Sequence, residues 1–554
     1  MGEKKGTRVR SNYIMQGSIL AAASIISRII GMLYRLPVTN IIGDQGNSYY
    51  SAAYEVYNII LLISSYSLPL AVSKVVSAKV ALGEHRNAWR SFKAAMCMSL
   101  VVGVLASALT FFGAGFFTGT LLNTPESELC LKVLSLAIFV MAIMGVLRGY
   151  FQGMGTMMPT AVSQVIEQIV NAVVSIVAAS LLYSYGTSLD AAEGVTEGTG
   201  GAIYGAAGST LGTSLGAAAG LVFLIIVMLM YNRVLQKNLR RDHVSEDQSY
   251  GSMIRILVLT IVPVILSTAV YNISGFIDQG VFKFLMLDLQ NADKEMVDVY
   301  WGIYVGKYKL LTNVPIAVAS ALSASTIPAL TRARMAGNKK EMCRKTEGSI
   351  RMVMLICVPS AFGLTALGEP ILDLLNWNTD KSAPLMFLMG SSAVIFYGLS
   401  TLTNGILQGI DRMQIPVRNA VIALASHLLV LVVLVQFAGI HIYGVVIAYL
   451  FFALLMCILN GVAIRKYLNY RQEIKRTFLI PGVSSLIMAL SVWLLYTPLE
   501  GALGNKPATV LCLLLAVLIY GFFILFLRGV TEAELLAFPK GRLIVKALKK
   551  IHLI

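Results

Sequence analysis

Long apolar runs recur from one end of this 554-residue chain to the other, and they limit its fold more than any other feature. Each run has about 20 residues, the length that a helix needs to cross the hydrocarbon core of a bilayer. Charged residues make up only 13% of the chain, whereas soluble proteins carry roughly 25%. The longest polar segment, 232–250, is too short to hold a core. The sequence therefore predicts an all-α integral membrane protein.

The apolar runs predict fourteen transmembrane helices arranged as two lobes and two further helices. We assign an N-terminal lobe of helices one to six to residues 1–240 and a C-terminal lobe of helices seven to twelve to residues 241–470. Residues 471–554 then hold two additional helices and a basic cytoplasmic tail. The expected helices are 13–36, 48–80, 91–118, 128–152, 160–184, 202–231, 252–287, 299–331, 349–372, 384–408, 417–437, 442–464, 478–498 and 507–529.

The distribution of charge predicts the orientation. The net charge of +16 could suggest nucleic acid, but the surplus lies in alternate short loops. Basic loops around 86–90, 233–241, 332–340 and 465–476 alternate with acidic ones around 190–197 and 288–295. Because Lys/Arg-rich loops stay cytoplasmic, we expect a multi-pass protein of the cell membrane with both termini inside and no nucleic-acid partner. The tail from Arg528 is expected to lie on the inner membrane surface, and a basic tail that is only solvated is the alternative.

The stretch from Arg148 to Asn171 joins two apolar helices and is echoed later in the chain. It reads RGYFQGMGTMMPTAVSQVIEQIVN, with a Gly-Met-Gly turn after Gln152 and with Pro159 opening the next helix. Residues 404–418 repeat the Gln-Gly, polar turn and proline as NGILQGIDRMQIPVR. LPLAVS (68–73) and VPIAVA (314–319) form a second pair at a similar offset of about 250 residues. The chain is therefore predicted to contain two related halves.

Several motifs that could indicate chemistry have simpler explanations. GTSLG (212–216) matches a nucleophile pattern, but Gly208, Gly212, Gly216 and Gly220 recur every four residues and predict a face for close helix packing. The six cysteines lie mostly in apolar runs, and the five histidines have no metal-ligand spacing. We therefore expect no cofactor, no metal and no enzymatic activity.

Ionisable and amide side chains inside the apolar runs are the candidate functional residues. Such groups are costly in a membrane and mark a functional interior by default. The alternative is that they pair with one another and hold the helices together; for Glu55 and Glu167 both interpretations stay open. Arg148 could be a functional residue or an ordinary inner-surface anchor. Bases outnumber acids, so we expect positive charge to remain for an anionic ligand. The candidate substrate-binding residues are Arg28, Arg35, Glu55, Lys74, Glu167, Asn171, Asp278, Lys307 and Lys309.

These residues resemble a known family. The motif SR-x-x-G-x-x-x-R in the first helix, the 148–168 motif and the two pseudo-repeated halves resemble the polysaccharide-transporter branch of the multidrug/oligosaccharidyl-lipid/polysaccharide (MOP) flippase superfamily. The 148–168 motif is most similar to the stage V sporulation protein B and lipid II flippase group. The resemblance implies two six-helix lobes around a central cavity and a groove for a lipid tail at helices thirteen and fourteen. It also implies that Arg28 and Arg35 meet a substrate diphosphate, with Lys307 or Lys309 contributing from helix eight.

The leading hypothesis is a flippase that moves an undecaprenyl-diphosphate-linked oligosaccharide, most plausibly lipid II, from the inner to the outer leaflet. No nucleotide-binding motif is present, so the membrane potential or an ion gradient would drive transport. One alternative is a cation-coupled multidrug exporter of the same superfamily, in which Glu55, Glu167 or Asp278 would bind the cation. The other alternative is a membrane glycosyltransferase or polymerase, which would need a catalytic carboxylate near a membrane surface.

Overall fold

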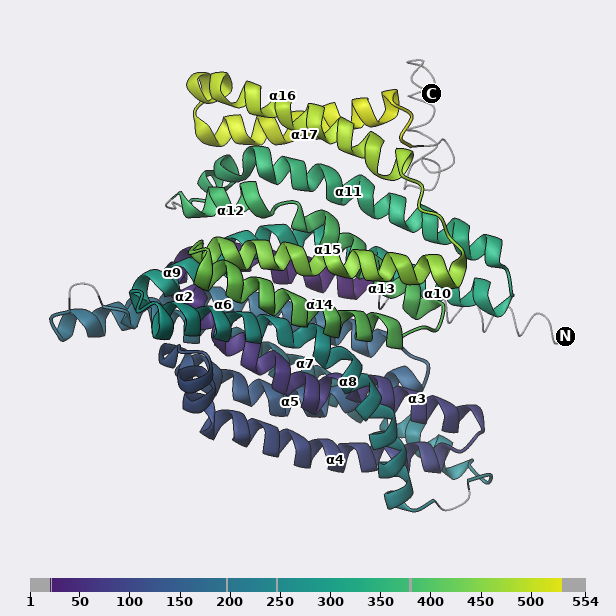
Figure 1. Cartoon of the computed structure of the whole chain (residues 1–554). Helices are drawn as coiled ribbons and strands as arrows, with labels where there is room; N and C mark the ends of the chain where they lie inside the picture. Colours follow the sequence, from purple (N-terminus) through teal and green to yellow (C-terminus); the bar gives the residue numbers. More distant parts are fainter. Residues whose placement is uncertain (1–19, 21, 196–197, 246–247, 378–380, 531–554) are drawn as a thin grey trace. The chain divides into compact units, whose positions relative to one another are not determined.

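A computed structural model describes residues 20, 22–195, 198–245, 248–377 and 381–530 of the chain (Figure 1). These residues form helices joined by short turns, and the described part of the chain contains no strand. The predicted all-α fold is therefore confirmed. The predicted cytoplasmic tail and most of the N-terminal segment lie outside the described residues.

Within the described residues, eleven helices are long and apolar enough to cross a membrane, or twelve if the bent pair α12 (Ser382–Gly390) and α13 (Ala393–Gly409) is one span. The chain is therefore a multi-pass membrane protein. The predicted number of fourteen is not confirmed. The described parts of the first and seventh predicted helices give apolar segments of only Ala22–Leu33 and Tyr250–Val262.

The chain divides into two compact units, Met1–Gly302 and Ile303–Ile554. This division follows contacts between residues in space, whereas the predicted lobes 1–240, 241–470 and 471–554 follow the repeat in the sequence. The two divisions describe different properties, so the lobe boundaries remain predictions. After the helix Ala22–Leu33, the first unit contains α2 (Arg35–Leu61), α3 (Leu68–Ala81), α4 (His85–Phe112), α5 (Glu128–Gly153), α6 (Met158–Ala192), α7 (Gly200–Arg240), α8 (Tyr250–Lys283) and α9 (Lys294–Ile303), whose last residue starts the second unit.

The second unit carries its own apolar core, built mainly from α10, α11, α13 and α15. A smaller cluster forms where α16 and α17 pack on each other and on α11 (Figure 1). Its helices are α10 (Leu310–Met335), α11 (Lys339–Leu374), α12 (Ser382–Gly390), α13 (Ala393–Gly409), α14 (Gln414–Val432), α15 (His441–Leu468), α16 (Ile480–Leu503) and α17 (Asn505–Phe526).

The two predicted helix breaks are present. Helix α5 ends at Gly153, and α6 begins at Met158 with Pro159 in its first turn, where a missing N–H costs nothing. In the echo of this motif, α13 ends at Gly409 and α14 begins at Gln414, two residues before Pro416. The same succession of glycine, short turn and proline thus ends one helix and starts the next in each unit.

The second sequence pair also has a shared local structure. A π-helical turn, Leu62–Tyr66, precedes α3 with Pro69 near its start. Another, Tyr304–Lys309, leads into α10, which contains Pro315. Proline lacks an N–H and its ring clashes with the carbonyl four residues earlier, so the helix must widen, bend or break near it. The repeat seen in the sequence therefore includes a repeated irregularity of the backbone.

The glycines of α7 pack against the backbone of α6, as predicted. A Cβ atom built on Gly208 would lie 2.4 Å from the carbonyl oxygen of Ala178, and one on Gly216 would lie 2.6 Å from that of Glu167. The same atom on Gly212 would lie 2.1 Å from the hydroxyl of Ser175. Real Cβ atoms essentially never come this close, so the absence of side chains lets α6 and α7 approach each other.

Candidate functional site

A polar stripe on α6 faces the helix Ala22–Leu33. The hydroxyl of Ser24 donates to Oε1 of Gln164 at 3.3 Å. One helical turn further, a Cβ atom built on Gly31 would lie 3.3 Å from Oε1 of Gln168. The predicted polar face of α6 therefore contacts the helix that carries Arg28, which places both features in one region of the first unit.

Arg35 opens α2 and lies against an aromatic ring. Its guanidinium carbon is 3.9 Å from the ring centroid of Tyr50, and Tyr50 stacks on Tyr54 with the centroids 4.4 Å apart. The Tyr54 hydroxyl is hydrogen bonded to that of Thr213 on α7. Nη1 of Arg35 is buried and has no hydrogen-bond partner among the described residues. The ring thus orients a cation that still has unused donors.

Arg148 and Glu167 form an ion pair between α5 and α6. Nη2 of Arg148 lies 2.8 Å from Oε2 of Glu167, and each side chain is 12% exposed. Nε of Arg148 also donates to the hydroxyl of Ser163 at 3.0 Å. The structure thus contains a pairing contact for Glu167, and its role in substrate binding stays a prediction. Arg148 therefore forms an ion pair with Glu167, in addition to any role as an anchor at the inner membrane surface.

Asn171 lies one turn beyond Glu167 and connects α6 to the chain just before Arg35. Its Nδ2 donates to the hydroxyl of Tyr34 at 3.3 Å, and its Oδ1 accepts from Ser175 at 2.9 Å. Asn171 is only 5% exposed. Because Tyr34 directly precedes Arg35, this contact fixes the backbone from which the Arg35 side chain extends.

The remaining candidates are spread over the structure. Arg28 and Lys74 are exposed, and Arg28 makes no ion pair with the described acidic residues. Glu55 is partly buried beside Gly275 of α8, where a Cβ atom would lie 2.4 Å from its Oε1. Asp278, in the same helix, is buried.

Two candidates belong to the second unit. Lys307 is buried, and Nζ of Lys309 lies 5.5 Å from the ring centroid of Tyr304 and 5.4 Å from that of Tyr449. Both lysines belong to the π-helical turn that precedes α10. Each unit therefore holds a cation against aromatic rings, Arg35 in the first and Lys309 in the second.

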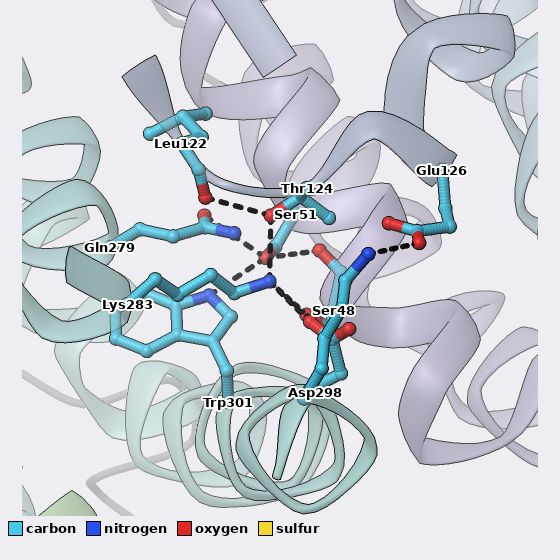
Figure 2. Close-up of polar contacts among 10 residues, drawn as sticks. Ser48, Ser51, Leu122, Thr124, Glu126, Gln279, Lys283, Asp298 and Trp301 are labelled. Atoms are coloured by element: carbon cyan, nitrogen blue, oxygen red, sulfur yellow. Dashed lines mark hydrogen bonds and ion pairs between the residues drawn. The ribbon is translucent and has the colours of Figure 1, made fainter. Parts of the chain in front are cut away.

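A buried ion pair that the sequence analysis missed joins the end of α8 to α9 (Figure 2). Lys283 and Asp298 form this pair, with side chains 0% and 3% exposed. Nζ of Lys283 also donates to Thr124 at 2.6 Å and to Ser48 at 3.2 Å, and Ser48 donates to Asp298 at 3.0 Å. We call these four residues the Lys283 cluster.

Further contacts surround the Lys283 cluster. Nε1 of Trp301 donates to the hydroxyl of Ser51 at 3.0 Å, and Ser51 also lies 3.4 Å from Oε1 of Gln279 (Figure 2). Gly302 lets the backbones of α2 and α9 meet, since a Cβ atom there would lie 1.7 Å from the carbonyl oxygen of Asp44. The cluster therefore ties α2, α8, α9 and the segment before α5 together. The sequence signal that could have indicated this pair is the presence of opposite charges, Lys283 and Asp298, near the facing ends of two consecutive predicted helices.

Comparisons of the whole chain with known proteins identify a family and similar proteins. The family profile described as "Polysaccharide biosynthesis protein" matches residues 15–334. Over 501 residues the chain is 26% identical to "Lipid II flippase MurJ" of Bacillus subtilis (strain 168), covering 87% of this chain and 88% of that protein. It is also 26% identical over 148 residues to "Stage V sporulation protein B" of the same organism, covering 27% of this chain and 29% of that one.

Solved structures show the same fold. "Lipid II flippase MurJ, inward closed conformation" matches with a TM-score of 0.65 and 14% identity, over 92% of this chain and 98% of that one. An inward-facing multidrug resistance MATE family transporter of the MOP superfamily matches with a TM-score of 0.61 and 13% identity, over 81% and 98%. At these identities the likeness concerns the architecture of the chain.

Proposed function

Because the chain belongs to the polysaccharide biosynthesis protein family, we propose that it is a flippase for a lipid-linked saccharide precursor. The predicted resemblance to the MOP superfamily is confirmed by the family match and by the relatives of known structure. The proposed substrate is an undecaprenyl-diphosphate-linked oligosaccharide, with lipid II as the leading candidate. The relative named as a lipid II flippase, which is similar over nearly the full length of both chains, supports this choice.

The observation that carries the proposal is the Arg35–Tyr50 contact. Arg35 is partly buried, the ring of Tyr50 holds its guanidinium, and its buried Nη1 has no acceptor among the described residues. A phosphate oxygen is the natural acceptor for such a donor, because the planar guanidinium can offer two parallel N–H groups. Arg28 lies seven residues earlier, on the helix Ala22–Leu33 that precedes α2, and adds a second positive charge. We assign Arg28 and Arg35 to the diphosphate.

An apolar cavity in the second unit suits the lipid tail. It has a volume of about 450 Å³ and lies between α10, α11, α16 and α17. Leu311, Leu355, Leu367, Met488 and Val517 are among its lining residues. A polyprenyl chain is all hydrocarbon, so such a wall would stabilise it by burying apolar surface. We assign this cavity to the lipid-tail groove that the family resemblance implies for helices thirteen and fourteen.

The proposed mechanism is alternating access of two lobes. A diphosphate cannot cross hydrocarbon unaided, and a cationic cavity would replace its hydration. The sequence has no nucleotide-binding motif, so we assign the driving force to the membrane potential or an ion gradient. Both termini are proposed to be cytoplasmic on the basis of the basic loops. In this orientation the Lys283 cluster lies toward the outer side, near the acidic segment 288–295.

A cation-coupled multidrug exporter is the second candidate. The specific observation in its favour is that α2 and α8 each carry an acid where they meet. Glu55 of α2 lies beside Gly275 of α8, and Asp278 is buried one turn further along α8. Buried carboxylates in a membrane commonly bind protons or cations. Drug sensitivity of a deletion strain separates the two candidates, because a flippase for cell-wall precursors should leave it unchanged.

The direct test is depletion of the protein in its own cell, followed by labelling of lipid II in the outer leaflet. In a strain without a redundant flippase, we expect outer-leaflet lipid II to fall while total lipid II rises. Restoration by the wild-type gene, but not by an Arg35→Ala variant of equal abundance, would tie the effect to the proposed site. Unchanged outer-leaflet lipid II in such a strain would exclude the lipid II role.

A further inference from the structure

A second cavity in the second unit combines an apolar wall with a basic rim. It has a volume of about 650 Å³ and lies between α11, α13, α15 and the loop that follows α15. Ile350, Leu399, Ile464 and Phe478 form much of the wall. The rim is formed by Arg465 at the end of α15 and by Tyr470, Arg471 and Gln472 of the loop. Its lining shares no residue with the Arg35–Tyr50 contact or with the apolar cavity described above.

The polar groups within the apolar wall are already satisfied. The hydroxyl of Thr403 donates to the carbonyl oxygen of Leu399 at 2.9 Å and accepts from Nδ2 of Asn460 at 3.1 Å. The Cys457 thiol lies 3.1 Å from the carbonyl oxygen of Phe396. Unused hydrogen-bond donors therefore concentrate at the rim, on the loop side of the cavity.

Tyr470 provides a buried hydroxyl without an acceptor. The residue is 8% exposed, and its hydroxyl proton has no acceptor among the described residues, although the backbone N–H of Glu473 interacts with the oxygen. Burial, reinforced by the negative charge of Glu347, raises the pKa of Tyr470 to about 12. The phenol is therefore protonated at physiological pH and offers its proton to an incoming acceptor. A buried polar group without a partner is costly, so a ligand that supplies the acceptor would be favoured.

The acids near the rim are engaged elsewhere. The carboxylate of Glu473 accepts from the backbone N–H groups of Arg476 and Thr477 and from the Thr477 hydroxyl, at 2.8–3.0 Å. These bonds lower the pKa of Glu473 although burial opposes them, so it stays ionised and in place. Glu347 pairs with Arg351 at 3.0 Å. Arg465 and Arg471 are exposed and make no ion pair with the described acids, which leaves two cations at the rim.

We propose that this cavity binds the phosphate of an anionic phospholipid, with the acyl chain along the apolar wall. The loop lies directly between two candidate membrane spans, His441–Leu468 and Lys475–Leu503, so the rim is at headgroup level. Basic pockets between helices at a membrane surface are suited to anionic headgroups. Arg465 and Arg471 contact the phosphate oxygens, and the Tyr470 hydroxyl donates from within the cavity. This proposal does not rest on the flippase function.

The test measures lipid binding to the purified full-length chain in detergent by native mass spectrometry and by the shift in unfolding temperature. Phosphatidylglycerol, phosphatidylcholine and inorganic phosphate are titrated separately. We expect saturable binding of phosphatidylglycerol, with little effect of the other two. Arg465→Gln with Arg471→Gln should weaken binding at least tenfold, since hydrogen bonds to charged groups are lost. Tyr470→Phe should weaken it about fivefold while leaving the lipid-free protein as stable as the wild type or more so.

The matched control is Arg332→Gln with Lys339→Gln, which removes two exposed cations at the end of α10 and the start of α11 in the same unit. It should bind phosphatidylglycerol as the wild type does. Equal binding of phosphatidylglycerol and phosphatidylcholine would overturn the proposal, as would unchanged binding by the Arg465/Arg471 variant. A saturable shift with inorganic phosphate alone, equal to that with the lipid, would show a site for the free anion and would equally overturn the lipid assignment.

Discussion

The Arg35–Tyr50 contact and the Lys283 cluster both hold a cation inside the first unit, but they differ in how that cation is satisfied. Lys283 has a carboxylate and two hydroxyl partners and is fully buried. Arg35 is partly exposed, and its guanidinium lies over the ring of Tyr50. Its buried Nη1 has no acceptor among the described residues. The aromatic face stabilises positive charge without occupying the in-plane donors.

This difference separates a structural charge from a charge available to a ligand. A buried cation with a complete set of partners holds helices in place, and removing one partner leaves the other stranded. A cation with unused donors does little for packing but can meet an anion when one arrives. The Arg148–Glu167 pair lies between these limits, because its two side chains are paired and still partly exposed.

The largest expected effect is on the Lys283 cluster. Lys283→Met should destabilise the protein by about 3–5 kcal/mol, because it leaves the Asp298 carboxylate buried without its cation. Immunoblots of membranes and thermal unfolding would show the loss. Lys283→Met combined with Asp298→Leu should recover most of it, since an apolar pair of similar size carries no stranded charge. Wild-type abundance and stability of the single variant would contradict a structural role for this pair.

The second prediction concerns Arg35. Arg35→Ala should reduce transport at least tenfold in a complementation or flipping assay while membrane abundance stays near normal. Arg35→Lys should be partly active, because an ammonium cannot reproduce the planar fork of donors. The exposed Lys93→Ala is a control for loss of one positive charge in the same unit. A fully active Arg35→Ala protein would refute the assignment of this residue to the substrate.

Arg148 and Glu167 should show an intermediate effect. Glu167→Gln is expected to cost about 1–2 kcal/mol, since Arg148 loses its carboxylate but keeps the hydroxyl of Ser163. A double-mutant cycle with Arg148→Gln would measure the coupling between the two side chains. If the coupling is near zero and Glu167→Gln is stable but defective in transport, Glu167 acts in transport and its ion pair with Arg148 is not its main role.

The smallest effects are expected at Tyr50. Tyr50→Phe keeps the aromatic face under Arg35 and should leave transport almost unchanged. Tyr50→Leu removes that face, which stabilises a cation by about 0.5–2 kcal/mol, and should lower transport severalfold. The two variants are compared at equal abundance in the same assay. If Phe and Leu behave alike, the ring does not orient the Arg35 guanidinium.

The sequence predicted local features of the first unit well. The helix break at Gly153, the start of α6 near Pro159 and the packing face at Gly212 follow from rules that involve only neighbouring residues or a regular spacing. The polar face of α6 could be predicted for the same reason, because Gln164, Gln168 and Asn171 follow the helical period.

What the sequence could not reveal is which charges meet. Lys283 and Asp298 are separated by a turn, and their two hydroxyl partners come from distant parts of the chain, so no periodicity links the four. The sequence likewise did not indicate which residue pairs with Glu167, whereas the structure shows that it is Arg148. Pairing of this kind depends on how helices pack on one another, which a pattern within one helix does not encode.

The repeated π-helical turns before Pro69 and Pro315 have a mechanical consequence. A helix resists bending through its ladder of backbone hydrogen bonds, and that ladder is disturbed where a π turn meets a proline. Each half of the chain therefore has a compliant joint at the same place in its repeat, with stiffer helical rods on either side. Bending at these joints would reorient a long helix while leaving the side-chain packing along each rod intact.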